Sequence, residues 1–128
     1  MEPGPVRSIS AVTLVTSDMY RSVSFYRALG FALLYGGGDA DFTSFRVGEG
    51  FLNLQLRPTF SEQKPVEEPW GRVIFWVDDV DVMFERAIGS GLSPEGQPAD
   101  AAWGERYFHI RDPDGHELSF ARLLDKPA

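Results

Sequence analysis

The sequence predicts an α+β protein built from two βαβββ modules in tandem. Two stretches share one plan, VTLVTSDMYRSVSFYRALGF (12–31) and VIFWVDDVDVMFERAIGSGL (73–92). They align at a constant offset of 61, which joins three residue pairs: Val12 with Val73, Asp18 with Asp79, and Gly30 with Gly91 (73 − 12, 79 − 18, 91 − 30). Three strand-like stretches follow each copy, so the order β, α, β, β, β occurs twice.

Each copy begins with a β-strand and continues as a helix that starts after an aspartate and ends at a glycine. An aspartate side chain accepts hydrogen bonds from the free N–H groups of a helix start, and glycine adopts the left-handed conformation that often ends a helix. Apolar residues fall on one face of each predicted helix. These are Met19, Val23, Tyr26 and Leu29, flanked by Phe25, in the first helix, and Val80, Phe84, Ala87 and Ile88 in the second.

The remaining strands complete each module. We expect strands at 31–36, 41–48 and 51–57 after the first helix, and a weak strand near 92–99 followed by 106–111 and 116–123 after the second. Residues 58–70 contain three prolines and four charged residues, which is typical of a linker. We therefore expect a single domain, 1–128, made of two modules (about 7–57 and 71–123) that pack together or against another chain.

Composition narrows the classes of function. The chain has no cysteine, which excludes disulfides, thiolate metal sites and cysteine nucleophiles. It has no apolar run near the roughly 18 residues of a membrane span, and its first residues lack the pattern of a signal peptide, so we expect no membrane partner and a cytoplasmic location. The net charge of −7 disfavours nucleic acid as a partner.

The modules and their motifs resemble the vicinal oxygen chelate superfamily of glyoxalases, bleomycin resistance proteins and extradiol dioxygenases. The resemblance covers about residues 9–123. It is carried by SDMYRSVSFYRALGF, VDDVDVMFERAIGSG and most specifically WGERYFHIRDPDGHELSF, which is similar to bleomycin-resistance-type members. It implies an eight-stranded half-open barrel, the glyoxalase/bleomycin resistance fold, in which each module forms half of a cup. It also implies a homodimer, with the cavity formed either within one chain or across a swapped pair.

Enzymes of this superfamily usually hold a divalent metal with His and Glu from the first and last strands of the two modules. Carried onto this sequence, the four ligand positions fall on Ala11, Gln55 (with Asn53 on the same face), Arg72 and Ser119. Alanine has no lone pair to donate, arginine repels a cation, and serine and glutamine are weak neutral donors. We therefore expect no metal and no other cofactor.

The two-residue alternation of strands predicts what lines the cup instead. The expected ligand-binding residues are Asn53, Gln55, Arg72, Trp76, Trp103, Tyr107, His109, Glu117 and Ser119. Trp76 and Trp103 are candidate stacking surfaces for a planar ligand, with core packing an equal alternative for Trp76. Arg72 should meet Glu117 or an anionic group of the ligand, because a buried arginine requires a partner. His116 is expected at the rim.

The leading hypothesis is a metal-free protein that binds a small organic molecule. It would sequester an aromatic or cationic, antibiotic-like ligand between two subunits. The alternative is a lyase or isomerase of the same fold that uses Glu117 or His109 as a general base. A regulatory or scaffold module without a ligand is the third hypothesis.

Overall fold

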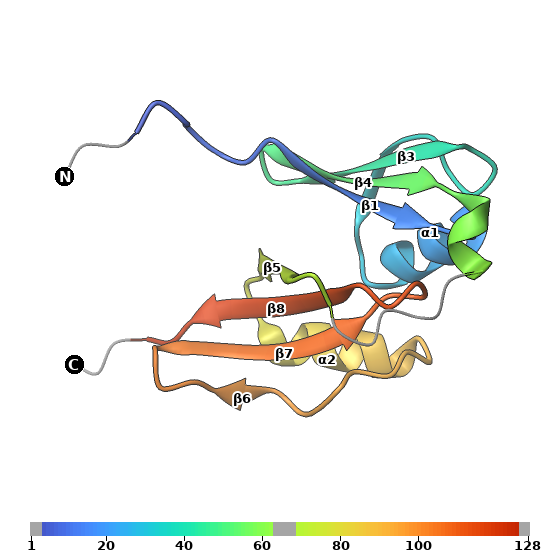
Figure 1. Ribbon diagram of the computed structural model, residues 1–128. Helices are drawn as coiled ribbons and strands as arrows, with labels where there is room; N and C mark the ends of the chain where they lie inside the picture. The colour runs from blue at the N-terminus through green and yellow to red at the C-terminus, as the bar shows by residue number, and fades with distance from the viewer. Residues whose placement is uncertain (1–3, 63–68, 126–128) are drawn as a thin grey trace.

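The computed structural model describes residues 4–62 and 69–125, and it confirms the predicted α+β fold of two βαβββ modules (Figure 1). The first module contains β1 (Ala11–Thr16), α1 (Met19–Ala28), β2 (Ala32–Tyr35), β3 (Phe42–Val47) and β4 (Gly50–Leu56). The second contains β5 (Arg72–Trp76), α2 (Val80–Gly89), β6 (Ala99–Asp100), β7 (Glu105–Arg111) and β8 (Glu117–Leu123). The sheet orders are β1-β4-β3-β2 and β5-β8-β7-β6.

The two helices occupy equivalent positions in the repeat. Both α1 and α2 have ten residues, and their first residues are 61 apart (80 − 19). Asp18 accepts a hydrogen bond from the Arg21 backbone N–H, and Asp79 does the same for Val82, as predicted for helix starts. The two modules therefore share one local plan.

Two connections differ from the sequence prediction. The weak strand expected near 92–99 is wrong in position, because β6 comprises only Ala99–Asp100. Pro94 and Pro98 lack the backbone N–H that a strand needs for pairing, which accounts for the irregular path before β6. The predicted linker begins with a 3₁₀-helix, η1 (Pro58–Glu62), and its residues 63–68 lie outside the described residues.

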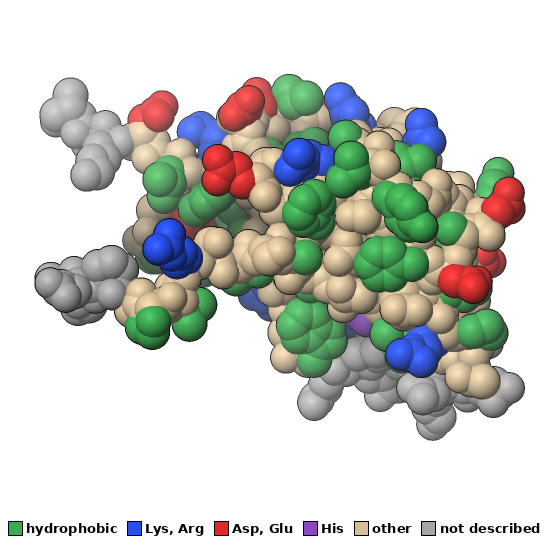
Figure 2. Space-filling view, turned by 90° about the horizontal axis from the view of Figure 1, so that it is seen from above, with side chains coloured by type: hydrophobic (Ala, Val, Ile, Leu, Met, Phe, Trp, Pro, Cys, Tyr) green, Lys and Arg blue, Asp and Glu red, His purple; other side chains and the backbone are tan. Residues whose placement is uncertain are grey.

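One hydrophobic core joins the modules. The Phe31 ring lies 5.0 Å from Phe75 and 6.2 Å from Phe120, both in the second sheet, and it also packs against Tyr26 and Phe45 of its own module. Figure 1 shows α1 on the side of the first sheet that faces the second module. The opposite face of the first sheet is therefore turned outward, and Figure 2 shows hydrophobic side chains among polar ones when this module is seen from above.

The turn between β7 and β8 holds the first module through its two aspartates. The Asp114 carboxylate accepts hydrogen bonds from the Ser17 backbone N–H (3.0 Å), the Ser17 hydroxyl (2.9 Å) and the Ser22 hydroxyl (3.1 Å). Asp112 accepts from the Tyr26 hydroxyl at 2.7 Å. Burial raises the pKa of Asp112 and, together with the Asp112 charge, raises the pKa of Tyr26. We call Asp112 and Asp114 with these partners the module clasp.

His116 lies beneath the same junction, so its predicted place at the rim is wrong. The residue is buried, its Nε2 atom donates to the Val15 carbonyl oxygen at 2.8 Å, and its ring stacks on Phe60 of η1. A carbonyl oxygen only accepts, so this contact requires a proton on Nε2. His116 thus supports the fold.

We expect Asp114→Ala to lower the free energy of unfolding by about 1–3 kcal/mol, because the variant removes the acceptor of three inter-module hydrogen bonds. Urea unfolding followed by circular dichroism measures this change. Asp125→Ala removes an exposed carboxylate of equal charge and serves as the control. Equal stability of the two variants would show that the clasp contributes little.

Candidate ligand-binding site

The register of the second sheet arranges its outer face in rows that run across β5, β8 and β7. The alternate residues Phe108, Ile110, Leu118 and Phe120 are buried in the core, so their neighbours face the other way. The pairing aligns three rows on that outer face: Arg72, Glu117 and Arg111; Ile74, Ser119 and His109; Trp76, Ala121 and Tyr107. The first row consists of charged residues, the second contains a serine and a histidine beside Ile74, and the third contains two aromatic residues beside Ala121.

An ion pair fills the first row. The Nε atom of Arg72 lies 2.5 Å from Oε1 of Glu117, as the sequence predicted, but the arginine side chain is 47% exposed and so is not the buried arginine that was expected. Burial alone would raise the pKa of Glu117, yet the bond and charge of Arg72 outweigh it and lower that pKa. Glu117 is therefore a stable carboxylate and a weak base.

A histidine and a serine face each other in the second row. Nδ1 of His109 lies 2.5 Å from Oγ of Ser119, and Ser119 is only 2% exposed. Burial and the Arg72 charge lower the pKa of His109, while the carboxylates of Glu117 and Glu95 act in the opposite direction. A lowered pKa leaves the imidazole neutral at neutral pH.

Aromatic rings continue the site beyond His109. Trp103 stacks on Tyr107 with ring centroids 6.0 Å apart, and Tyr107 lies 5.0 Å from His109. The Trp103 indole N–H donates to Glu105 at 3.1 Å, which holds the exposed ring in place. Trp76 is 64% exposed on the same sheet face, so core packing was the wrong alternative for this residue.

A small pocket of about 100 Å³ opens where these rows meet. It brings together five of the predicted residues with three neighbours: Arg72, Trp103, Tyr107, His109 and Ser119, with Ile74, Glu105 and Ala121. Glu117 lines an adjacent cavity of about 310 Å³ together with Arg72. Trp76 lies outside both linings.

The structure does not bring Asn53 and Gln55 into this pocket. Both lie on β4 in the other sheet, where Asn53 donates to the Thr13 hydroxyl at 3.2 Å and Gln55 pairs in register with Val15. Within one chain, the predicted ligand-binding residues thus form two separate groups, one on each sheet.

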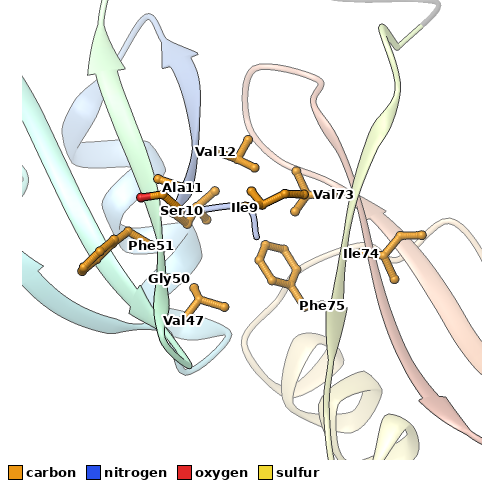
Figure 3. A pocket seen from close by; sticks show the side chains of 11 residues that line it. Ile9, Ser10, Ala11, Val12, Val47, Gly50, Phe51, Val73, Ile74 and Phe75 are labelled. Atoms are coloured by element: carbon orange, nitrogen blue, oxygen red, sulfur yellow. The ribbon is translucent and has the colours of Figure 1, made fainter. Parts of the chain in front are cut away.

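Sequence reasoning missed an apolar cleft of about 240 Å³ between β1 and β5. Figure 3 shows side chains of Ile9, Val12, Val73 and Phe75 pointing into the space between the two strands. Its lining is Ile9, Ser10, Ala11, Val12, Val47, Gly50, Phe51, Leu52, Val73, Ile74 and Phe75. The sequence feature that could have indicated this cleft is the repeat, because it makes β1 and β5 equivalent strands.

Residues 8–120 match the Glyoxalase/Bleomycin resistance protein/Dioxygenase superfamily. The chain belongs to this superfamily. Two regions of uncharacterized proteins, from Mycobacterium bovis and Mycobacterium tuberculosis, are 39% identical over 46 residues, or 36% of this chain. The match spans only 30% and 27% of those two proteins.

Several solved structures are similar to this chain over nearly its whole length. TioX from Micromonospora sp. ML1 is 29% identical, with a TM-score of 0.71 over 92% of this chain and 100% of that one. A superfamily protein from Nocardioides is 27% identical, with a TM-score of 0.70 over 98% and 91%. A bleomycin-binding protein in complex with bleomycin is 20% identical, with a TM-score of 0.70 over 94% and 100%, which shows a shared fold.

The residues expected at the superfamily's metal positions, Ala11, Gln55, Arg72 and Ser119, do not fit a divalent ion. Ala11 lines the apolar cleft, Arg72 is bonded to Glu117, and the Ser119 hydroxyl is bonded to His109. Across residues 4–62 and 69–125, no three His, Asp or Glu side chains gather as a metal site would require. In the same residues, no helix is long and apolar enough to cross a membrane.

We expect the purified protein to carry no stoichiometric zinc, nickel, manganese or iron, and a chelator to leave its melting temperature unchanged, because no metal-binding free energy is lost. Elemental analysis and thermal unfolding measure the two quantities. Ser119→Glu alone should not create a metal site while the Arg72 cation remains beside it. Stoichiometric metal coordinated on the outer sheet faces would contradict this assignment.

Proposed function

We propose that this protein binds a planar, aromatic or cationic small organic molecule without a metal and sequesters it stoichiometrically. The observation that carries the proposal is the run of Trp103, Tyr107 and His109 rings beside the pocket. Stacked rings contribute about 0.5–1.5 kcal/mol beyond the area they bury, and tryptophan and tyrosine faces attract cations. The Glu105 carboxylate at the pocket and the net charge of −7 add to the attraction for a cation.

An antibiotic-like ligand is the finer form of this proposal. The bleomycin-binding protein has the same fold and holds bleomycin in its solved complex. The residues of the present pocket suit such a molecule, since they combine aromatic faces with a few fixed polar groups. Bleomycin is therefore the first probe to test.

A second copy of the chain would complete the cavity. The pocket of about 100 Å³ is smaller than the roughly 300–1,000 Å³ of most organic-ligand sites. Ile74, Trp76 and Leu123 are exposed on the same sheet face, and Asn53 and Gln55 are on the outer face of the other sheet. We propose that the first sheet of one copy covers the second sheet of its partner, which would unite both groups of residues in a homodimer.

The ionic row favours binding over the lyase or isomerase alternative. Glu117 is held as a carboxylate by Arg72 and lies outside the aromatic pocket. A general base requires a pKa near the working pH and access to the substrate, and Glu117 has a lowered pKa and does not line the aromatic pocket. Of the two candidate bases, His109 is the one that lines this pocket.

Bleomycin added to the protein should quench tryptophan fluorescence, and Trp103→Ala should weaken binding by about tenfold, or ~1.4 kcal/mol, because the variant removes the outer stacking surface. Isothermal titration calorimetry measures both affinities. Trp70→Ala is the matched control, since Trp70 is exposed and does not line the pocket. Equal binding by Trp103→Ala and the wild type would contradict the stacking role.

Light scattering should give about twice the chain mass of 14.3 kDa. Ile74→Lys should shift the protein to a monomer, because it places a charge in the proposed apolar contact. Val82→Lys should not, although Val82 is equally exposed at 56%, since it lies on α2. A wild-type mass of 14.3 kDa at high protein concentration would rule out the dimer.

A further inference from the structure

In the hydrogen bond between His109 and Ser119, either the imidazole or the hydroxyl can be the donor. The residues are directly paired across β7 and β8, and Nδ1 lies 2.5 Å from Oγ. A neutral imidazole carries one proton, so Nδ1 either donates to the hydroxyl oxygen or accepts the hydroxyl proton. The two arrangements present different atoms to the pocket.

Burial of Ser119 favours the hydroxyl as the donor. The residue is 2% exposed, and within the described part of the chain Nδ1 of His109 is the one hydrogen-bond partner of its Oγ. If Nδ1 donated, the serine proton would remain buried without an acceptor, which is costly. If the hydroxyl donates, its proton and the Nδ1 lone pair satisfy each other. The proton of the ring then resides on Nε2.

We propose that Ser119 locks neutral His109 in the Nε2–H tautomer, so that the pocket presents an N–H donor to its ligand. The tautomer stands independently, whereas the ligand class that it selects rests on the proposed function. That class is a planar molecule with a neutral hydrogen-bond acceptor, either a carbonyl oxygen or a ring nitrogen. The acceptor would meet His109 while the ring stacks on Tyr107 or Trp103.

The charged groups around His109 agree with a neutral ring. Arg72 faces it from β5, Glu117 from β8 and Glu95 from the segment before β6, and burial with Arg72 outweighs the two carboxylates to lower the pKa of His109. In the Nε2–H tautomer the free lone pair lies on Nδ1 and is occupied by Ser119. The ring therefore acts as a donor to the ligand and does not accept its proton.

Long-range ¹H–¹⁵N correlation spectra of the labelled protein test the tautomer without any ligand. At a pH well above that of histidine protonation, we expect His109 to show a protonated Nε2 and an unprotonated Nδ1. His116 gives the only other ring signals, and a His109→Gln variant assigns the two. Ser119→Ala should give averaged shifts of mixed tautomers, and Ser119→Thr should restore the single tautomer. A protonated Nδ1 in the wild type, or unchanged shifts in Ser119→Ala, would overturn the proposal.

Quinoline and naphthalene test the ligand class, since they match in size and only quinoline carries an acceptor. Quinoline should bind about fivefold more tightly, the effect of one neutral hydrogen bond. His109→Phe keeps a ring but no donor, and it should abolish that preference. Equal affinities in the wild type would overturn the ligand class. If neither probe binds, the ligand class fails, while bleomycin binding still decides the proposed function and the nitrogen shifts still decide the tautomer.

Discussion

Strand β8 is buried on both of its faces, and this burial determines which side chains the neighbouring strands of the second module must provide. Its residues Glu117–Ala121 are all buried between β5 and β7. Leu118 and Phe120 can enter the core, but the alternate residues include a carboxylate and a hydroxyl that require partners. Arg72 and His109 supply them from the neighbouring strands. The serine in the middle of an otherwise packed strand is therefore the residue that fixes the polar centre of the pocket.

Local sequence was sufficient to predict both helices and the faces of β5, β7 and β8. Asp18 and Asp79 cap helices through backbone groups three residues away, and alternation placed Tyr107, His109 and Ser119 on one face. Such features depend on near neighbours or on a strict period of two. Core packing also followed the alternation, because each outward residue implies an inward neighbour.

Contacts between distant segments were beyond sequence reasoning. Asp112 and Asp114 have the pattern of a turn, and nothing near them indicates that Asp114 binds Ser17, which is 97 residues away. The separation of Asn53 and Gln55 from the pocket depends on how the modules pack, which the Phe31 contacts with Phe75 and Phe120 determine. No local period encodes that packing, so the division of the site between two sheets could only be seen in three dimensions.

The two modules agree in their helices and differ in the faces that would form a cavity. The outer face of β1 and β4 offers two aliphatic side chains, one hydroxyl, two amides and a phenyl ring, whereas that of β5, β7 and β8 offers an ion pair, a histidine and stacked rings. In the proposed pair of chains, each cavity combines one face of each kind. An unlike pair orients a ligand, because the ion pair, the histidine and the stacked rings lie on the second sheet while the amides of the first sheet bind its far end. The two modules therefore have similar backbones, whereas the side chains on their outer sheet faces differ, so the proposed cavity is not symmetric.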